Sequence, residues 1–430
     1  MELIQIKMLL GQIWLRRSRW PMSSVLGLAS FGLQAAAALA QMLAASRVFT
    51  KSDYASFSLG IATASLWAVL GLEWLRSAVA RFAPVACGRA LTDLRNTWNA
   101  GYVYYVGVTM AAMLLVAFAA PNYRGLAAAV AFIALTQGYS DLALTILRSR
   151  GRWNTFAVRQ SVRAVGSTMA AVLAALTTKS AEFTLCAYGI GLMLPFLDVP
   201  KMSELQRVFR SDFPFRGLEG CLRYGLPVAL TSVAFIGVPV TVRWWVSGLQ
   251  GLEEAAGWLL AIDLYQRPFG VLLGAVVAFI SPALMRSHDQ ASSAGQQRKS
   301  MALSQIRVLV IGVTLALFCL LTSGPVNSLL VPKPLSASFV TIANSAIVFS
   351  FSQAVLQYCG TLPFVVNKEA VALIRIFSIN IAVILAFLML PVPQGVDFNP
   401  PSRLLAAGVL ISLYVIFTAI SGLIRAQRER

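Results

Sequence analysis

The amino-acid sequence predicts an all-α polytopic membrane protein of about twelve transmembrane helices, arranged as two six-helix bundles. Of its 430 residues, 58% are hydrophobic and only 12% are charged, and the mean hydropathy is +0.72. Average soluble domains carry about 25% charged residues, so this chain has too little polar surface for a soluble protein. Its apolar residues fall into runs of about 20, the length that crosses a bilayer as a helix. The second half of the chain repeats the arrangement of the first.

The high positive charge and the scarcity of metal-binding side chains narrow the function classes. A formal net charge of +18 can indicate nucleic-acid binding, but membrane proteins gather Lys and Arg on their cytoplasmic loops. We therefore expect no nucleic-acid partner. The five cysteines lack CxxC or other metal-like spacing, and the single histidine, His288, lies in a polar loop. The sequence predicts no metal site, no cofactor and no histidine-based catalytic site.

The first segment, residues 1–21, mixes apolar side chains such as Ile4 and Leu9 with basic ones such as Lys7 and Arg16. A signal peptide instead places its charges before the apolar run and ends at a cleavage site of small residues. The pattern favours an interfacial helix that lies along the membrane surface.

Twelve apolar runs follow, six in each half of the chain. The fifth is interrupted by Arg159 and Arg163, and the sixth is short for a span, with only residues 183–197 free of charge. The predicted spans are 22–45, 54–76, 99–121, 125–147, 154–176, 181–199, 222–247, 255–281, 307–328, 337–359, 370–391 and 404–424.

The loops between these spans differ strongly in positive charge. With the N-terminus in the cytoplasm, 25 of the 35 Lys and Arg fall on cytoplasmic loops or at cytoplasmic ends of spans and six on the outer side, and the other four are assigned to the spans themselves. Positive residues accumulate on the cytoplasmic side of membrane proteins. We therefore expect both termini in the cytoplasm.

The two halves of the chain follow one pattern. Asp53 precedes the second span, and Glu254 precedes the eighth in similar surroundings. Because each half has an even number of spans, both have the same orientation, and a pseudo-two-fold axis between them runs along the membrane normal. The charged stretch between the halves contains Pro214 and Gly217, as expected of a cytoplasmic linker. The predicted domains are the interfacial helix (1–21), an N-terminal six-helix bundle (22–199), the linker (200–221) and a C-terminal six-helix bundle (222–430).

The eighth span carries two charges near its middle, Asp263 and Arg267, followed directly by Pro268. An arginine at the centre of a span costs about 2.5–3.5 kcal/mol on insertion scales, so it normally faces a protein interior or an aqueous cavity. Pro268 removes a backbone donor and tends to kink the helix. Two interpretations of Arg267 remain: it binds an anionic substrate, or it neutralises Asp263 four residues earlier. Asp263 is also the candidate for coupling to a proton or sodium gradient.

Three more arginines lie in predicted spans and are further candidates for the substrate cavity. Arg163 lies nine residues into its helix, about 13 Å at 1.5 Å per residue, whereas Arg159 is shallow enough for its guanidinium to reach the surface. Arg243 lies near a helix end beside two tryptophans, where an interfacial anchor competes with a place in the cavity.

Other polar residues indicate gates or contacts between helices. Glu73 lies three residues before Arg76, and Asp141 lies one or two helical turns from Arg148. Each pair suits a local ion pair or a cytoplasmic gate. A polar series in the tenth span either faces the cavity or joins helices by hydrogen bonds. Its members are Asn344, Ser345, Ser352, Gln353 and Gln357.

Four stretches carry a family resemblance. RVFTKSDYASFSLGIATASLWAVLGLEWLRSAVARF (47–82) has a first-hairpin pattern, and LRSRGRWNTFAVRQSVRA (147–164) a link between the fourth and fifth helices. LRYGLPVAL (222–230) opens the second half, and Pro268 with SPALMR (281–286) marks its second helix. On these stretches the chain resembles bacterial polysaccharide flippases of the multidrug, oligosaccharidyl-lipid and polysaccharide exporter superfamily. Several of those relatives have fourteen helices, whereas twelve are predicted here.

The resemblance implies a two-lobed transporter, not an enzyme, in the bacterial cytoplasmic (inner) membrane. It would flip an undecaprenyl-pyrophosphate-linked oligosaccharide to the outer leaflet by alternating access, for O-antigen or exopolysaccharide biosynthesis. Its partners would be this glycan, membrane lipids and other polysaccharide assembly proteins. Arginine suits a pyrophosphate because it stays charged and donates paired hydrogen bonds, and all four cations within spans are arginine. The membrane potential would also favour outward movement of an anion.

Two other functions remain open. Membrane-embedded O-antigen ligases and polymerases are also basic proteins with many spans, but they need a substantial outer loop with catalytic residues. The longest outer loops here, about 329–337 and 391–403, are short and lack histidine. Export of amphipathic drugs by a related carrier would favour acids over arginines in the spans, the reverse of this sequence.

Overall fold

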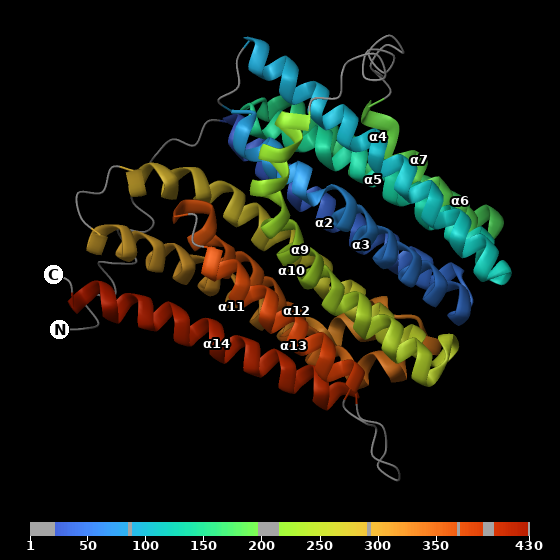
Figure 1. The fold of residues 1–430 in the computed structure, drawn as a ribbon. Helices are drawn as coiled ribbons and strands as arrows, with labels where there is room; N and C mark the ends of the chain where they lie inside the picture. Colours follow the sequence, from blue (N-terminus) through green and yellow to red (C-terminus); the bar gives the residue numbers. More distant parts are fainter. Residues whose placement is uncertain are drawn as a thin grey trace.

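The protein is a multi-pass bundle of long helices (Figure 1). The computed structural model describes residues 22–84, 88–196, 215–289, 294–367, 370–389 and 400–428, and this part of the chain contains helices and no strand. The predicted interfacial helix, 1–21, and most of the predicted linker, 200–214, lie outside the described residues. The first half consists of α2 (Met22–Val48), α3 (Lys51–Phe82), α4 (Gly88–Ala119), α5 (Arg124–Ser149), α6 (Trp153–Thr178) and α7 (Ala181–Met193), with short 3₁₀ turns at Pro121–Tyr123 and Leu194–Phe196. The second half consists of α9 (Phe215–Gln250), α10 (Leu252–Asp289), α11 (Ala294–Leu330), α12 (Lys333–Asn367), α13 (Ala370–Met389) and α14 (Pro400–Arg428).

Each predicted span corresponds to one of these helices, which confirms the all-α membrane fold. Eleven helices in the described ranges are long and apolar enough to cross a membrane, and the segment Ala181–Phe196 is a shorter apolar helix. The short helix is α7, whose sequence already fell short of a full span. α9 begins at Phe215, so the last residues of the predicted linker are helical.

Local sequence signals define several helix ends. The hydroxyl of Thr50 accepts a hydrogen bond from the backbone N–H of Asp53 (3.2 Å), which caps the first turn of α3. Gly251 separates α9 from α10 with φ = 82°, a left-handed conformation that glycine adopts without steric strain.

A proline inside α12 leaves one backbone carbonyl without its usual helical partner. Pro363 cannot donate to the carbonyl of Cys359 one turn earlier, and the side-chain amide of Gln305 donates to that carbonyl instead (3.0 Å).

The helix contacts of the first half recur in the second. α3 packs on α5 as α10 packs on α12, α2 on α6 as α9 on α13, and α5 on α7 as α12 on α14. The contacts between the halves show the same correspondence: α3 packs on α9, and α10, the counterpart of α3, packs on α2, the counterpart of α9. A two-fold relation between two six-helix units produces this pattern. In Figure 1, α4–α7 lie in the upper part and α11–α14 in the lower part, with α2, α3, α9 and α10 between them.

The two halves meet closely along α3 and α9. Gly225 of α9 lies so near α3 that a Cβ there would overlap the backbone carbonyl of Trp74. Farther along the same pair of helices, the indole N–H of Trp244 donates to the hydroxyl of Thr63 (3.1 Å). At the end of α2, Arg47 donates to two backbone carbonyls at the end of α11 (3.4 Å each).

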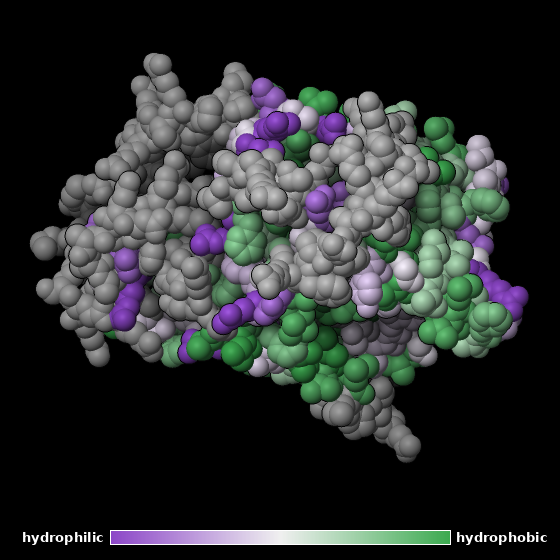
Figure 2. Space-filling view, turned by 45° about the horizontal axis from the view of Figure 1, so that its top comes forward, coloured by the Kyte–Doolittle hydropathy of each residue, from purple (hydrophilic) through white to green (hydrophobic). Residues whose placement is uncertain are grey.

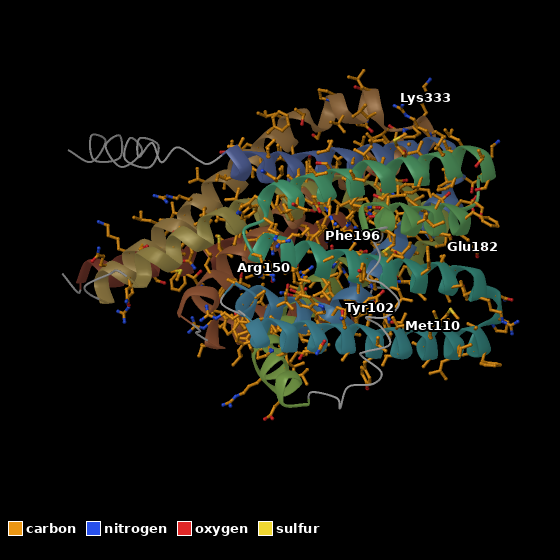
Figure 3. The ribbon with its side chains drawn as sticks, turned by 90° about the horizontal axis from the view of Figure 1, so that it is seen from above. Tyr102, Met110, Arg150, Glu182, Phe196 and Lys333 are labelled. Atoms are coloured by element: carbon orange, nitrogen blue, oxygen red, sulfur yellow. The ribbon has the colours of Figure 1, made fainter. Side chains whose placement is uncertain are left out.

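The outer surface suits a bilayer. Apolar side chains form continuous areas on the flank shown in Figure 2, and hydrophilic side chains appear there in smaller groups. Large apolar side chains such as Leu115, Phe118 and Leu321 are strongly exposed, which in water would be unfavourable. Glu182 and Lys333 lie toward one end of the molecule, and Arg150 lies at the connection of α5 and α6, away from that end (Figure 3).

Candidate functional site

A large cavity lies between the two halves. Its volume is about 690 Å³, and residues of α2, α3, α5, α6, α7, α9, α10 and α12 line it. Five arginines and three carboxylates are among the lining residues that the structure describes. They are Arg76, Arg148, Arg163, Arg243, Arg267, Glu73, Asp141 and Asp263.

The first group of charges comes from α3, α5 and α6. Arg163 Nη1 lies 2.6 Å from Asp141 Oδ1, and Arg76 Nη2 lies 2.5 Å from Glu73 Oε2. Arg76 is also 3.8 Å from Asp141, and Arg148 interacts electrostatically with Arg76, Glu73 and Asp141. Three cations therefore face two carboxylates. This group remains net positive when every ion pair is formed, so it can attract an anion.

Asp263 of α10 is the centre of the second group, which joins the two halves. Its side chain is only 1% exposed. The carboxylate accepts hydrogen bonds from Ser58 (2.5 Å) and Tyr54 (3.3 Å) of α3, and Arg243 of α9 donates to it at 2.9 Å. A buried carboxylate needs such partners to offset its lost hydration. Any movement that separates α3 from α10 at this level must break the bonds from Ser58 and Tyr54.

Arg267 lines the cavity at the edge of this second group. Its Nε lies 3.8 Å from Asp263 Oδ1, compared with 2.9 Å for Arg243, and its side chain is 19% exposed, compared with 4% for Arg243. The close ionic partner of Asp263 is therefore Arg243. The sequence suggested that Arg267 neutralises Asp263, but this structural role describes Arg243 better than Arg267.

The two remaining arginine candidates, Arg243 and Arg159, differ in whether they line the cavity. The interfacial-anchor interpretation of Arg243 is wrong, because its guanidinium is buried and also donates to Gln266 (2.7 Å) and to the backbone carbonyl of Pro239 (3.1 Å). Arg159 is absent from the cavity lining, and its guanidinium lies 5.5 Å from the ring centroid of Phe196.

The polar series of α12 also divides between the two roles predicted for it. Ser352 bonds to the carbonyl of Val348 and to Ser412 of α14, both at 2.7 Å, and thus joins helices. Gln353 and Gln357 line the cavity. Asn344 is exposed and Ser345 is buried, and neither lines the cavity.

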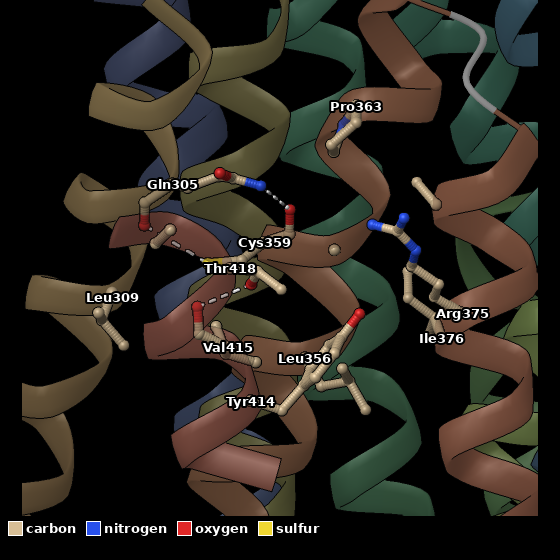
Figure 4. Close-up of a pocket in the computed structure, with 13 residues that line it drawn as sticks. Gln305, Leu309, Leu356, Cys359, Pro363, Arg375, Ile376, Tyr414, Val415 and Thr418 are labelled. Atoms are coloured by element: carbon tan, nitrogen blue, oxygen red, sulfur yellow. Dashed lines mark hydrogen bonds between the residues drawn. The ribbon is translucent and has the colours of Figure 1, made fainter. Parts of the chain in front are cut away.

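A second, much smaller cavity of about 70 Å³ lies among α11, α12, α13 and α14 (Figure 4). The Gln305 amide and the Cys359 carbonyl that it contacts line this cavity, and the guanidinium of Arg375 extends from α13 beside them. The remaining lining is mostly apolar. The cavity is too small for a glycan, and the proline in α12 explains the contact between Gln305 and the Cys359 carbonyl.

Sequence analysis missed Tyr54, Ser58 and Gln266. Tyr54 and Ser58 are four residues apart and so share a face of α3. That spacing was visible in the sequence, but isolated hydroxyls are common in membrane helices. No group of three or more His, Cys, Asp or Glu side chains able to hold a metal ion exists within the described ranges.

No protein-family model and no curated protein sequence matches this chain. Solved structures match 94% of it. A structure of the lipid II flippase MurJ in an inward closed conformation has 13% identity and a TM-score of 0.63, with 89% of that chain covered. An outward-facing multidrug resistance MATE family transporter of the MOP superfamily has 14% identity and a TM-score of 0.60, with 94% covered. A MOP superfamily transporter from Pyrococcus furiosus, described as having a binding pocket of reverse polarity, has 12% identity and a TM-score of 0.56, with 94% covered. At such identities the likeness concerns the fold: this chain has the fold of the MOP superfamily transporters.

Proposed function

We propose that this protein is a flippase that moves an undecaprenyl-pyrophosphate-linked oligosaccharide from the inner to the outer leaflet of the bacterial cytoplasmic membrane. The observation that carries the proposal is the cavity between the halves, where five arginines face three carboxylates. A pyrophosphate requires cations that stay charged in a partly dry site, and guanidinium groups have this property. The volume of about 690 Å³ also falls in the range of about 300–1,000 Å³ typical of ligand pockets.

In this proposal, the two halves of the chain move relative to each other during transport. We assign residues 22–199 and 222–430 to two bundles that alternate between opening the cavity to one leaflet and to the other, with the connection at 200–221 on the cytoplasmic side. The substrate's pyrophosphate would enter the net-positive group around Arg76, Arg148 and Arg163, and Arg267 would contact it from the opposite bundle. Asp263 is the candidate for coupling this motion to a proton or sodium gradient, because it is the carboxylate that joins both halves.

The fold neighbours include a lipid II flippase and multidrug transporters, so drug export is the second candidate. Many exported drugs are organic cations, which the excess of arginine in this cavity would repel at about 1 kcal/mol for a pair 4 Å apart in water and more in a drier site. A lipid-linked anion fits this site better. The cavity between the halves gives no support to a ligase or polymerase, because the chemistry of such an enzyme requires catalytic groups that face the outer side.

Removal of the protein tests the proposal in the cell. We expect undecaprenyl-pyrophosphate-linked oligosaccharide to accumulate on the inner leaflet and surface O-antigen or exopolysaccharide to fall. The intermediate should be resistant to glycan-digesting enzymes added from outside, and a plasmid copy should reverse both effects. Unchanged lipid-linked intermediates with a full polysaccharide yield would contradict the function. The same measurement tests the inner-membrane location and the link to polysaccharide assembly proteins, which supply and consume this intermediate.

A further inference from the structure

One wall of the large cavity differs chemically from the arginine groups. On α12, Ser350, Gln353 and Gln357 are spaced by three and four residues, so they share one face of the helix. All three line the cavity. Ser350 is only 2% exposed and Gln353 only 3%. This row, which we call the amide face, carries no charge.

The amide face has unused hydrogen-bonding capacity. The Ser350 hydroxyl, both polar atoms of the Gln353 amide and the carbonyl oxygen of the Gln357 amide have no hydrogen-bond partner among the described residues. Buried polar groups are normally paired, and an unpaired one is unfavourable by about 1–3 kcal/mol. Because these three residues line a cavity, small side-chain movements would let a ligand or water complete the missing bonds. Ser352, two residues from Ser350 on another face, has its bonds satisfied within the protein, so the deficit belongs to the cavity side of the helix.

The chemistry of the amide face selects a class of ligand. An amide offers a donor and an acceptor side by side without charge, which matches a hydroxyl group that both donates and accepts. A pyrophosphate is drawn instead to the arginines, and a metal cation prefers carboxylates. Tyr358, the residue after Gln357, lines the same cavity as Glu73, Arg76 and Arg148. The amide face therefore shares this cavity with the positive group of the other half.

We propose that Ser350, Gln353 and Gln357 form a carbohydrate subsite that binds hydroxyl groups of the sugar next to the pyrophosphate. This inference rests on the proposed function and assigns the sugar and the pyrophosphate to different walls of one cavity. Sugar hydroxyls would replace water at the amide face and reproduce its hydrogen bonds. A site built to bond a hydroxyl discriminates strongly against a ligand that lacks it. The amide face is thus a determinant of glycan specificity.

Two synthetic probes test the subsite: a short-chain polyprenyl pyrophosphate, and the same lipid carrying a disaccharide. Binding of each to the purified full-length protein in lipid nanodiscs is measured for wild type and for the double variant Gln353→Met, Gln357→Met. Methionine keeps the length of the side chain while removing its donor and acceptors. The matched control is Asn344→Leu, on the same helix and outside the cavity lining.

We expect wild type to bind the glycosylated probe more tightly than the bare one. The double variant should bind the glycosylated probe about tenfold more weakly, the loss expected for one or two neutral hydrogen bonds. Its affinity for the bare probe, which also reports correct folding, should be unchanged, as should both affinities of the control. Equal affinities of the double variant and wild type for the glycosylated probe would overturn the subsite and leave the flippase proposal standing. Failure of wild type to bind either probe would instead overturn the flippase proposal itself.

Discussion

Asp263 is the residue at which the two halves depend on each other. Its carboxylate is held by Ser58 and Tyr54 from one half and by Arg243 from the other. Removal of one charged partner from such a buried pair leaves the remaining charge uncompensated, which destabilises by about 3–5 kcal/mol. Arg267, at 3.8 Å, is a looser neighbour whose main role we assign to the substrate.

The roles of Arg267 and Asp263 can be separated by mutation. Arg267→Lys keeps the charge but loses the paired donors, so transport should fall by about tenfold, the loss of one charged hydrogen bond, and Arg267→Gln should reduce it further. Asp263→Asn leaves Arg243 buried without its carboxylate, so the double variant Arg267→Gln, Asp263→Asn should stay defective. Transport is measured at matched membrane abundance. Arg159→Gln, outside the cavity, is the control and should be near normal. A fully active double variant would reduce Arg267 to a structural partner of Asp263.

At the scale of elements, the contact of α3 with α9 fixes how the halves meet. Gly225 permits the backbones to approach, since a Cβ there would overlap the carbonyl of Trp74. Gly225→Leu should push the two helices apart, and overpacking of this kind destabilises by about 1–3 kcal/mol. We expect a lower thermal unfolding temperature and reduced transport. Gly220→Leu, at a position of the same helix with open space around it, is the matched control. If the two variants unfold alike, the close packing of α3 on α9 is incorrect.

The elements also show what the sequence could predict. All twelve predicted spans correspond to helices, because the length of an apolar run reflects the thickness of the bilayer and needs no knowledge of packing. Partners across helices were harder to find. The sequence paired Asp263 with Arg267 and Asp141 with Arg148, since spacing along one helix is visible in the sequence. The close partners are Arg243 and Arg163 on neighbouring helices, and these depend on how the helices pack.

At the scale of the whole molecule, the fold provides two equivalent halves around a net-positive cavity. The repeated contacts, with α3 on α9 matched by α10 on α2, allow one half to rock against the other with similar contacts on both sides. The polar linings differ, because the first half supplies three arginines and two carboxylates, and the second supplies two arginines, one carboxylate and the amide face. In the function that we propose, the two halves would provide the movement, and the side chains that line the cavity would determine what is carried.

The most direct test of this account is translocation by the purified protein in vesicles. A fluorescent undecaprenyl-pyrophosphate-linked oligosaccharide is placed in both leaflets, and its exposure to a membrane-impermeant quencher is followed over time, with a fluorescent organic cation as the competing substrate. We predict that the protein exposes the inner-leaflet fraction of the lipid-linked glycan much faster than protein-free vesicles do, that Arg76→Gln, Arg163→Gln greatly slows this exposure, and that the cation does not move. Exposure no faster than in protein-free vesicles, or transport of the cation in place of the glycan, would contradict the assignment of a cationic cavity to a lipid-linked pyrophosphate.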